Sequence, residues 1–204
     1  MDTLDHAMAT AGPLLSRIDE VLGAVGAPRD HGVWDEVRRV RLLPGDAARA
    51  VVALRAADLA AASAELRADA RAYAGIAKSL PPPGEWRGDA ADAYDAARHR
   101  IADHLSGGPD SLDERLEATA DLADALAEWM AQTRSDLAVT LAEVLGSAEA
   151  LSIVADAALD LAGHREVLAA ADAGERILRT VANSYDLAAD LLDGSTDLAI
   201  AVAV

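Results

Sequence analysis

Apolar side chains recur at steps of three and four residues along most of the chain, which places them on one face of an α-helix. The pattern is clearest over Pro44–Leu80, which we expect to form one long helix. Large and small side chains alternate along one seam of this helix, and such a seam lets an antiparallel helix pack closely at a shallow angle. The large residues are Val52, Leu59, Leu66, Tyr73 and Leu80, and the small ones are Ala56, Ser63, Ala70 and Ala77.

Two shorter patterns precede this helix. Helical spacing of apolar residues predicts a first helix over Pro13–Val25 and a second piece over Trp34–Leu43. The second piece carries Arg38, Arg39 and Arg41, the only dense basic cluster of the sequence. We expect these arginines to form a solvated face whose aliphatic stems cover the bundle. Alternatively, they meet an acidic partner.

A second arm follows the long helix after a short loop. It begins at Asp89 and is interrupted at residues 106–110, where glycine and proline disfavour a helix. Ser111 and Glu114 form a capping-box pattern that restarts the helix. The apolar pattern then continues to about Leu145, so the second arm is expected to be segmented.

The loop between the two arms contains the residues needed for a chain reversal. Pro81 stops the incoming helix, and Gly84 and Gly88 permit positive φ angles. Asp89 is a candidate N-cap of the outgoing helix. Trp86, the only large apolar side chain of the loop, is expected to be a plug between the two helix ends.

Trp86-Arg87-Gly88, followed by Ala90-Ala91 and Tyr94, resembles the W-x-G turn of the WXG family, the helical-hairpin substrates of ESX or type VII secretion in actinobacteria and their relatives. The resemblance covers about Pro44 to Leu145. It implies a secretion substrate or substrate-associated protein that acts through helix–helix pairing, with Trp86, Gly88 and Tyr94 as its turn and partner motif. The alternative is an ordinary helical hairpin in a cytoplasmic adaptor or scaffold unrelated to secretion.

The family pattern is not complete in this chain. Its second helix usually runs without a break, and one subunit of a pair carries a Tyr-x-x-x-Asp/Glu export signal. Here Tyr185 is followed four residues later by Ala189, and Asp190 comes one position too late. Three interpretations are open. Either Tyr185 and Asp190 form a degenerate signal, or a paired subunit supplies the signal, or the protein is not exported.

The predicted fold class is all-α, an elongated antiparallel helical hairpin or bundle with extra N- and C-terminal helices. We expect an N-terminal helical segment over residues 1–43, a WXG-like hairpin over 44–145 and a C-terminal helical extension over 146–204, joined in one continuous bundle. A last helix is predicted around Ile177–Leu192. The closing run Leu198–Val204 either packs on the bundle or stays loose.

Composition supports helices and limits the partners. Hydrophobic residues make up 52% of the 204 residues, but aromatics only 3%, and alanine and leucine dominate. The formal net charge is −17, which repels nucleic acid and anionic lipid. We therefore expect no nucleic-acid partner, and apolar runs far shorter than about 20 residues predict no membrane insertion. The expected partner is a second copy or another WXG-like hairpin protein, with the secretion machinery as a further one.

The sequence offers no catalytic site. Without cysteine, thiolate catalysis and cysteine-ligated metals are excluded. His99 and Asp103 share a helix face, but such a pair is typical of a surface hydrogen bond. No metal-ligand or cofactor-binding pattern is found, so we expect a non-enzymatic protein without a cofactor. The acidic start lacks a Sec-type signal peptide, so the expected location is secreted without a cleaved signal, with a cytoplasmic pool; the alternative is cytoplasmic.

Overall fold

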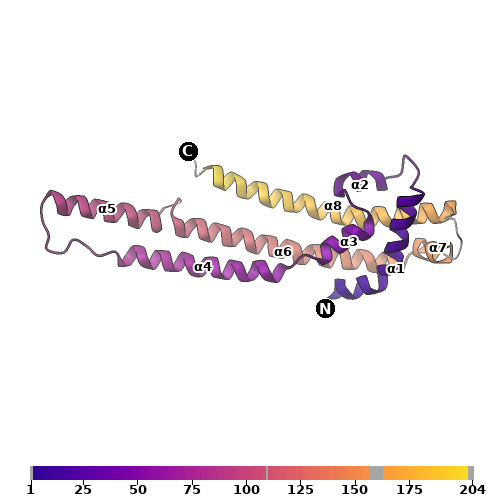
Figure 1. Cartoon of the computed structure of the whole chain (residues 1–204), viewed down its shortest axis with the longest axis horizontal. Helices are drawn as coiled ribbons and strands as arrows, with labels where there is room; N and C mark the ends of the chain where they lie inside the picture. Colours follow the sequence, from indigo (N-terminus) through magenta and orange to yellow (C-terminus); the bar gives the residue numbers. More distant parts are fainter. Residues whose placement is uncertain (1, 109, 157–162, 202–204) are drawn as a thin grey trace. The chain divides into compact units, whose positions relative to one another are not determined.

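The computed structural model describes the backbone of residues 2–108, 110–156 and 163–201, and the side chains of 2–108, 110–155 and 163–194. The chain is all-α, as predicted, and the described residues contain no strand. The side chains of the closing run Leu198–Val204 lie outside the described residues, so the two expectations for this run stay predictions. The helices are α1 (Thr3–Ala24), α2 (Val33–Val40), α3 (Pro44–Val52), α4 (Ala56–Ser79), α5 (Asp89–Leu105), α6 (Leu112–Leu145), α7 (Ala148–Asp156) and α8 (His164–Ala201) (Figure 1).

No single described helix is long and apolar enough to cross a membrane. By length and composition only, α6 and Ala148–Ala155 together pass that test, although they are bent by 61° at the break between them.

The first helix is longer than the apolar pattern predicted. It begins at Thr3 and contains Pro13 in its interior. The cause is a capping box: Asp2 accepts from the Asp5 amide, and the Asp5 carboxylate accepts from the Asp2 amide. These two bonds satisfy amide groups that the first turn leaves free, so the helix begins well before the proline.

The prediction of one helix over Pro44–Leu80 is wrong. The chain forms α3 and α4, separated at residues 53–55. The last carbonyls of α3 face the guanidinium of Arg134, whose Nη1 donates to the oxygens of Val51 and Val52. A side chain from α6 thus adds hydrogen bonds to carbonyls at the end of α3. The apolar pattern within α3 and α4 gives no indication of this contact.

Packing contacts divide the chain into two compact units, which do not follow chain order. Unit 1 comprises Met1–Arg55 and Trp129–Asp190, and unit 2 comprises Ala56–Glu128 and Leu191–Val204. The domain boundaries expected from the sequence stay a prediction.

Unit 1 has a conventional core of large aliphatic side chains. They come from α1, α2, α3, α6, α7 and α8, and α1 packs directly on α3 and α7. One charged group, Glu166 at the start of α8, is fully buried among the large side chains. The largest buried side chains are Leu4, Leu15, Ile18, Val21, Val33, Val51, Leu137, Leu141, Ile153, Ile177 and Leu178.

Unit 2 has a much thinner core. The buried side chains among its described residues are all small, and large ones such as Leu59, Leu66 and Tyr73 are only half-buried. Polar bonds link α4 to α6: Arg67 donates to Asp121 at 2.5 Å and to Asp124 at 2.6 Å. The seam of small residues expected on α4 is therefore the buried one. The buried residues of unit 2 are Ser63, Ala70, Ala77, Ala91, Ser111, Ala120 and Ala123.

Candidate functional site

The turn between α4 and α5 is built around glycine. Gly84 and Gly88 have φ angles of +65° and +91°, which residues with a side chain rarely adopt. Gly88, and not Asp89 as predicted, is the N-cap of α5, and its carbonyl accepts from the amides of Ala91 and Asp92. Asp89 is instead the first helical residue, where its charge favours the positive end of the helix.

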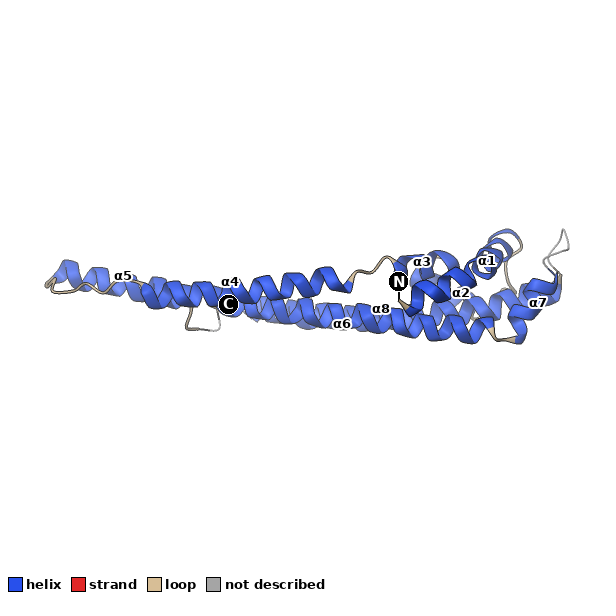
Figure 2. Ribbon diagram, turned by 90° about the horizontal axis from the view of Figure 1, so that it is seen from below, coloured by secondary structure: helices blue, strands red, loops and turns tan. Residues whose placement is uncertain are grey.

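Trp86 is not the buried plug that the sequence predicted. Its side chain is 57% exposed, and the buried residue at the start of α5 is Ala91. The loop runs alongside the N-terminal part of α5 in both views (Figures 1 and 2). In this arrangement the small side chain of Ala91 is covered and the indole of Trp86 lies largely outside.

Tyr94 ties the loop to α5 and contacts Trp86. Its hydroxyl donates to the carbonyl of Pro81 at 2.9 Å. The rings of Tyr94 and Trp86 have centroids 6.1 Å apart at an interplanar angle of 54°, a tilted aromatic contact. The structure thus brings together the three residues Trp86, Gly88 and Tyr94 that the sequence singled out.

Two further large apolar side chains of α4 and α5 are exposed. Ile101 lies seven residues after Tyr94, hence on the same face of α5, and is 52% exposed. On α4, Ile76 is 47% exposed. We call Trp86, Tyr94 and Ile101 the turn surface. Its side chains have apolar area to bury against a partner.

The histidine candidate pairs differently from the prediction. His99 Nδ1 lies 2.8 Å from the carbonyl oxygen of Asp95 and 3.4 Å from its carboxylate, so its neighbour is Asp95 rather than Asp103. No group of three or more histidine and acidic residues capable of holding a metal ion occurs within the described part of the chain.

The arginines of α2 bind carboxylates of their own unit. Arg38 pairs with Asp35, while Arg39 bonds Glu36 at 2.6 Å and Asp186 of α8 at 2.7 Å. Arg38 is largely exposed, as expected for a solvated face, but Arg39 also holds α2 on α8. An acidic partner of this cluster stays a prediction.

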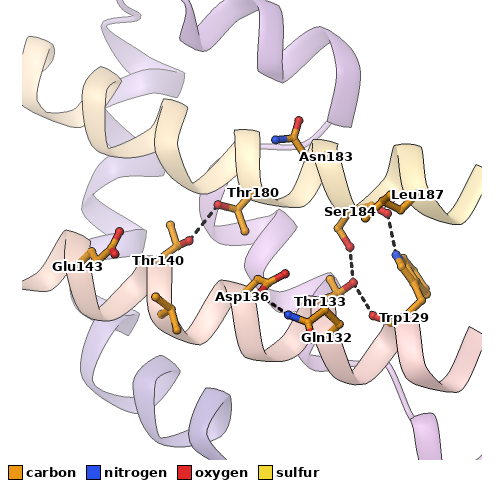
Figure 3. A pocket seen from close by; sticks show the side chains of 11 residues that line it. Trp129, Gln132, Thr133, Asp136, Thr140, Glu143, Thr180, Asn183, Ser184 and Leu187 are labelled. Carbon is orange, nitrogen blue, oxygen red and sulfur yellow. Dashed lines mark hydrogen bonds between the residues drawn. The ribbon is translucent and has the colours of Figure 1, made fainter.

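A shallow groove with a volume of about 400 Å³ lies between α6 and α8 in unit 1 (Figure 3). The sequence did not indicate it. Hydroxyl pairs cross its floor: Thr133 bonds Ser184, and Thr140 bonds Thr180 at 2.9 Å. Its lining residues are Trp129, Gln132, Thr133, Asp136, Val139, Thr140, Glu143, Thr180, Asn183, Ser184 and Leu187. The spacing of apolar residues by three and four along each helix could be read from the sequence. The sequence did not indicate which two helices would pack together.

Comparisons of the chain with protein-family models, with curated proteins and with solved structures found no match.

Proposed function

We propose that this protein is non-enzymatic and acts through helix–helix pairing, as a WXG-like substrate of type VII (ESX) secretion or as a protein associated with such a substrate. In this proposal α4, α5 and the first turns of α6 form the antiparallel hairpin. The observation that carries it is the exposed Trp86–Tyr94 pair beside the positive-φ Gly88. An exposed aromatic pair at a turn has apolar area that a partner can cover.

The thin core of unit 2 supports pairing. Burying apolar surface contributes about 25 cal/mol per Å², and the large side chains of α4 are only half-buried. A second pair of helices covering Ile76 and the turn surface would supply the missing burial. The partner is then a second copy or a related WXG-like hairpin protein, with the secretion machinery as a further contact.

On this proposal the protein is secreted without a cleaved signal peptide and also has a cytoplasmic pool. One observation favours the second candidate, a cytoplasmic helical adaptor or scaffold. Tyr185, the residue nearest to an export signal, is half-buried, and its ring centroid lies 6.4 Å from that of Trp129. A tyrosine held in this way is less accessible to a secretion receptor than one on a free tail.

Fractionation of the native host separates the two candidates. The tagged protein is followed in the medium and in the cell, in strains with and without the secretion machinery. Extracellular protein that depends on the machinery supports the first candidate. Retention in both strains, without lysis markers in the medium, supports the adaptor.

A mutation tests the turn itself. Trp86→Ala is expected to abolish recovery of the partner in a pull-down from the host, while the Tm changes little because the indole is largely exposed. Trp86→Phe keeps an aromatic ring and serves as the matched control. Unchanged pairing in the alanine variant would contradict the assigned role of the turn.

A further inference from the structure

The hydroxyl protons on the floor of the groove between α6 and α8 are already used in hydrogen bonds. The Thr133 hydroxyl donates to the Trp129 carbonyl at 2.8 Å, and the Thr180 hydroxyl donates to that of Arg176 at 3.2 Å. Ser184 and Thr140 are then the donors within the two hydroxyl pairs. Because all four hydroxyl protons are used, the floor offers no free hydroxyl donor to a polar ligand.

The sides of the groove carry exposed apolar groups instead. Val139 of α6 is 56% exposed, and Leu187 of α8 is 59% exposed. Both residues line the groove, one on each helix. Trp129 also lines it, with its indole nitrogen donating to the Ser184 carbonyl at 2.7 Å (Figure 3). An occupant must therefore present apolar side chains to two helices at once.

The charge along the groove has one sign. Asp136 and Glu143 are seven residues apart on α6 and so share its face, on either side of Val139. Asp136 accepts from the neutral Gln132 at 2.7 Å, and Glu143 forms no ion pair with a described residue. No lysine or arginine lines the groove, although Arg39 reaches Asn183 at its edge at 3.2 Å.

We propose that this groove docks a basic amphipathic helix of a partner protein. Its apolar stripe would cover Val139 and Leu187, and two lysines or arginines seven residues apart would face Asp136 and Glu143. The lining runs from Trp129 to Glu143, about 21 Å at 1.5 Å per residue, which corresponds to four helical turns. Binding of a helix in a groove is a common recognition mode, and complementary charge raises its association rate and its specificity.

A second copy of this chain is a poorer occupant. In a symmetric contact at this groove the carboxylates of Asp136 and Glu143 would face their own equivalents, and this repulsion is local to the groove. The acidic side chains of the groove therefore favour a basic partner, and its length and apolar sides favour a helix.

The test uses the full chain and a fluorescein-labelled synthetic helix of four to five turns, with a leucine stripe and two lysines seven residues apart. Fluorescence anisotropy measures binding at low salt. The double variant Asp136→Asn/Glu143→Gln is expected to weaken binding about tenfold, as is Val139→Ser/Leu187→Ser. Asp69→Asn/Asp103→Asn removes the same charge from exposed positions of unit 2 and should change affinity less than about twofold.

Several results would overturn the proposal. These are no binding of the lysine helix, equal binding of a helix with glutamate in place of lysine, and equal weakening by the groove and control variants. A self-association seen in sedimentation that Val139→Ser/Leu187→Ser removes would assign the groove to a second copy instead. Circular dichroism establishes that each variant is folded. Trp86→Ala should leave this binding unchanged, so a failure of the turn hypothesis is distinguishable from a failure here.

Discussion

Arg17 Nε donates to Oε1 of Glu166 at 2.7 Å, joining two residues 149 positions apart, and Oε2 of the same carboxylate has no hydrogen-bond partner among the described residues. Glu166 is fully buried, while Arg17 keeps contact with solvent and also pairs with Glu20 at 3.0 Å. The carboxylates of Glu166 and Glu20 raise the pKa of Arg17 further above its ordinary value. Arg17 is thus the group that neutralises a buried charge.

Arg17→Met is therefore expected to destabilise the protein strongly. Removing one partner of a buried ion pair leaves the other charge without compensation, which typically costs about 3–5 kcal/mol. The free energy of unfolding, measured by urea titration at neutral pH, should fall by that order. Glu20→Gln, which removes only an exposed partner of Arg17, should change it by less than about 1 kcal/mol.

The double variant Arg17→Met/Glu166→Leu distinguishes a charge effect from lost packing. It removes both charges and should recover most of the stability lost in Arg17→Met, because a buried pair replaced by apolar groups is often neutral. A double variant as unstable as the single one would show that the loss came from packing.

Gly88→Ala should destabilise unit 2 through the backbone alone. An added Cβ at Gly88 meets no atom within 4 Å, but the φ of +91° is strained for alanine. The expected cost is about 1–2 kcal/mol. Gly75→Ala is the matched control, since it lies inside α4 with equally open space, and it should stabilise the protein by up to about 1 kcal/mol. Thermal unfolding measures whether each variant has a lower or a higher Tm than the wild type. A stabilising Gly88→Ala would contradict this account.

The same turn shows how far the sequence was informative. Proline and glycine act locally, so the end of α4, the reversal and the start of α5 could be predicted to within a residue or two. The exposure of Trp86 could not, because local propensities do not specify how the loop packs on α5. Apolar character predicts that a side chain prefers burial, but not that the fold provides a place for it.

Interactions between residues distant in sequence explain the other errors. The break between α3 and α4 depends on Arg134, about 80 positions away, and the groove depends on α8 lying against α6. Periodicity within a helix indicates which of its faces is buried, but it does not indicate which helix will cover that face. The all-α class followed from composition and spacing, which are local properties.

Arg134→Met tests the role of this side chain in ending α3. The guanidinium is mostly buried and donates to carbonyls of α3 and to the carboxylates of Asp2 and Asp5. Its loss leaves partly buried carbonyls unsatisfied, so a fall of about 2–3 kcal/mol in the free energy of unfolding is expected. Hydrogen exchange should rise at the C-terminal end of α3 and in the first turn of α1. Arg134→Lys keeps the charge but has a single nitrogen, so it should recover only part of the loss.

The pH dependence of stability should include a contribution from Asp2. The amide of Asp5 and the guanidinium of Arg134 lower the pKa of its carboxyl below the ordinary value of about 3.9. Because the folded pKa is the lower one, this stabilisation is fully present above about pH 4. It is lost as the pH falls through the folded value.

Asp2→Asn isolates this charge, because asparagine is an equally good N-cap and keeps the bond to the Asp5 amide. The variant should be slightly less stable than the wild type at neutral pH, and the two should converge as the medium is acidified below the folded pKa. The side chain of Asp2 is half-exposed, so the difference is expected to be modest and to shrink in high salt. Urea titrations at a series of pH values measure both trends. A difference that stays constant across the acidic range would show that capping, and not the charge on Asp2, stabilises the start of α1.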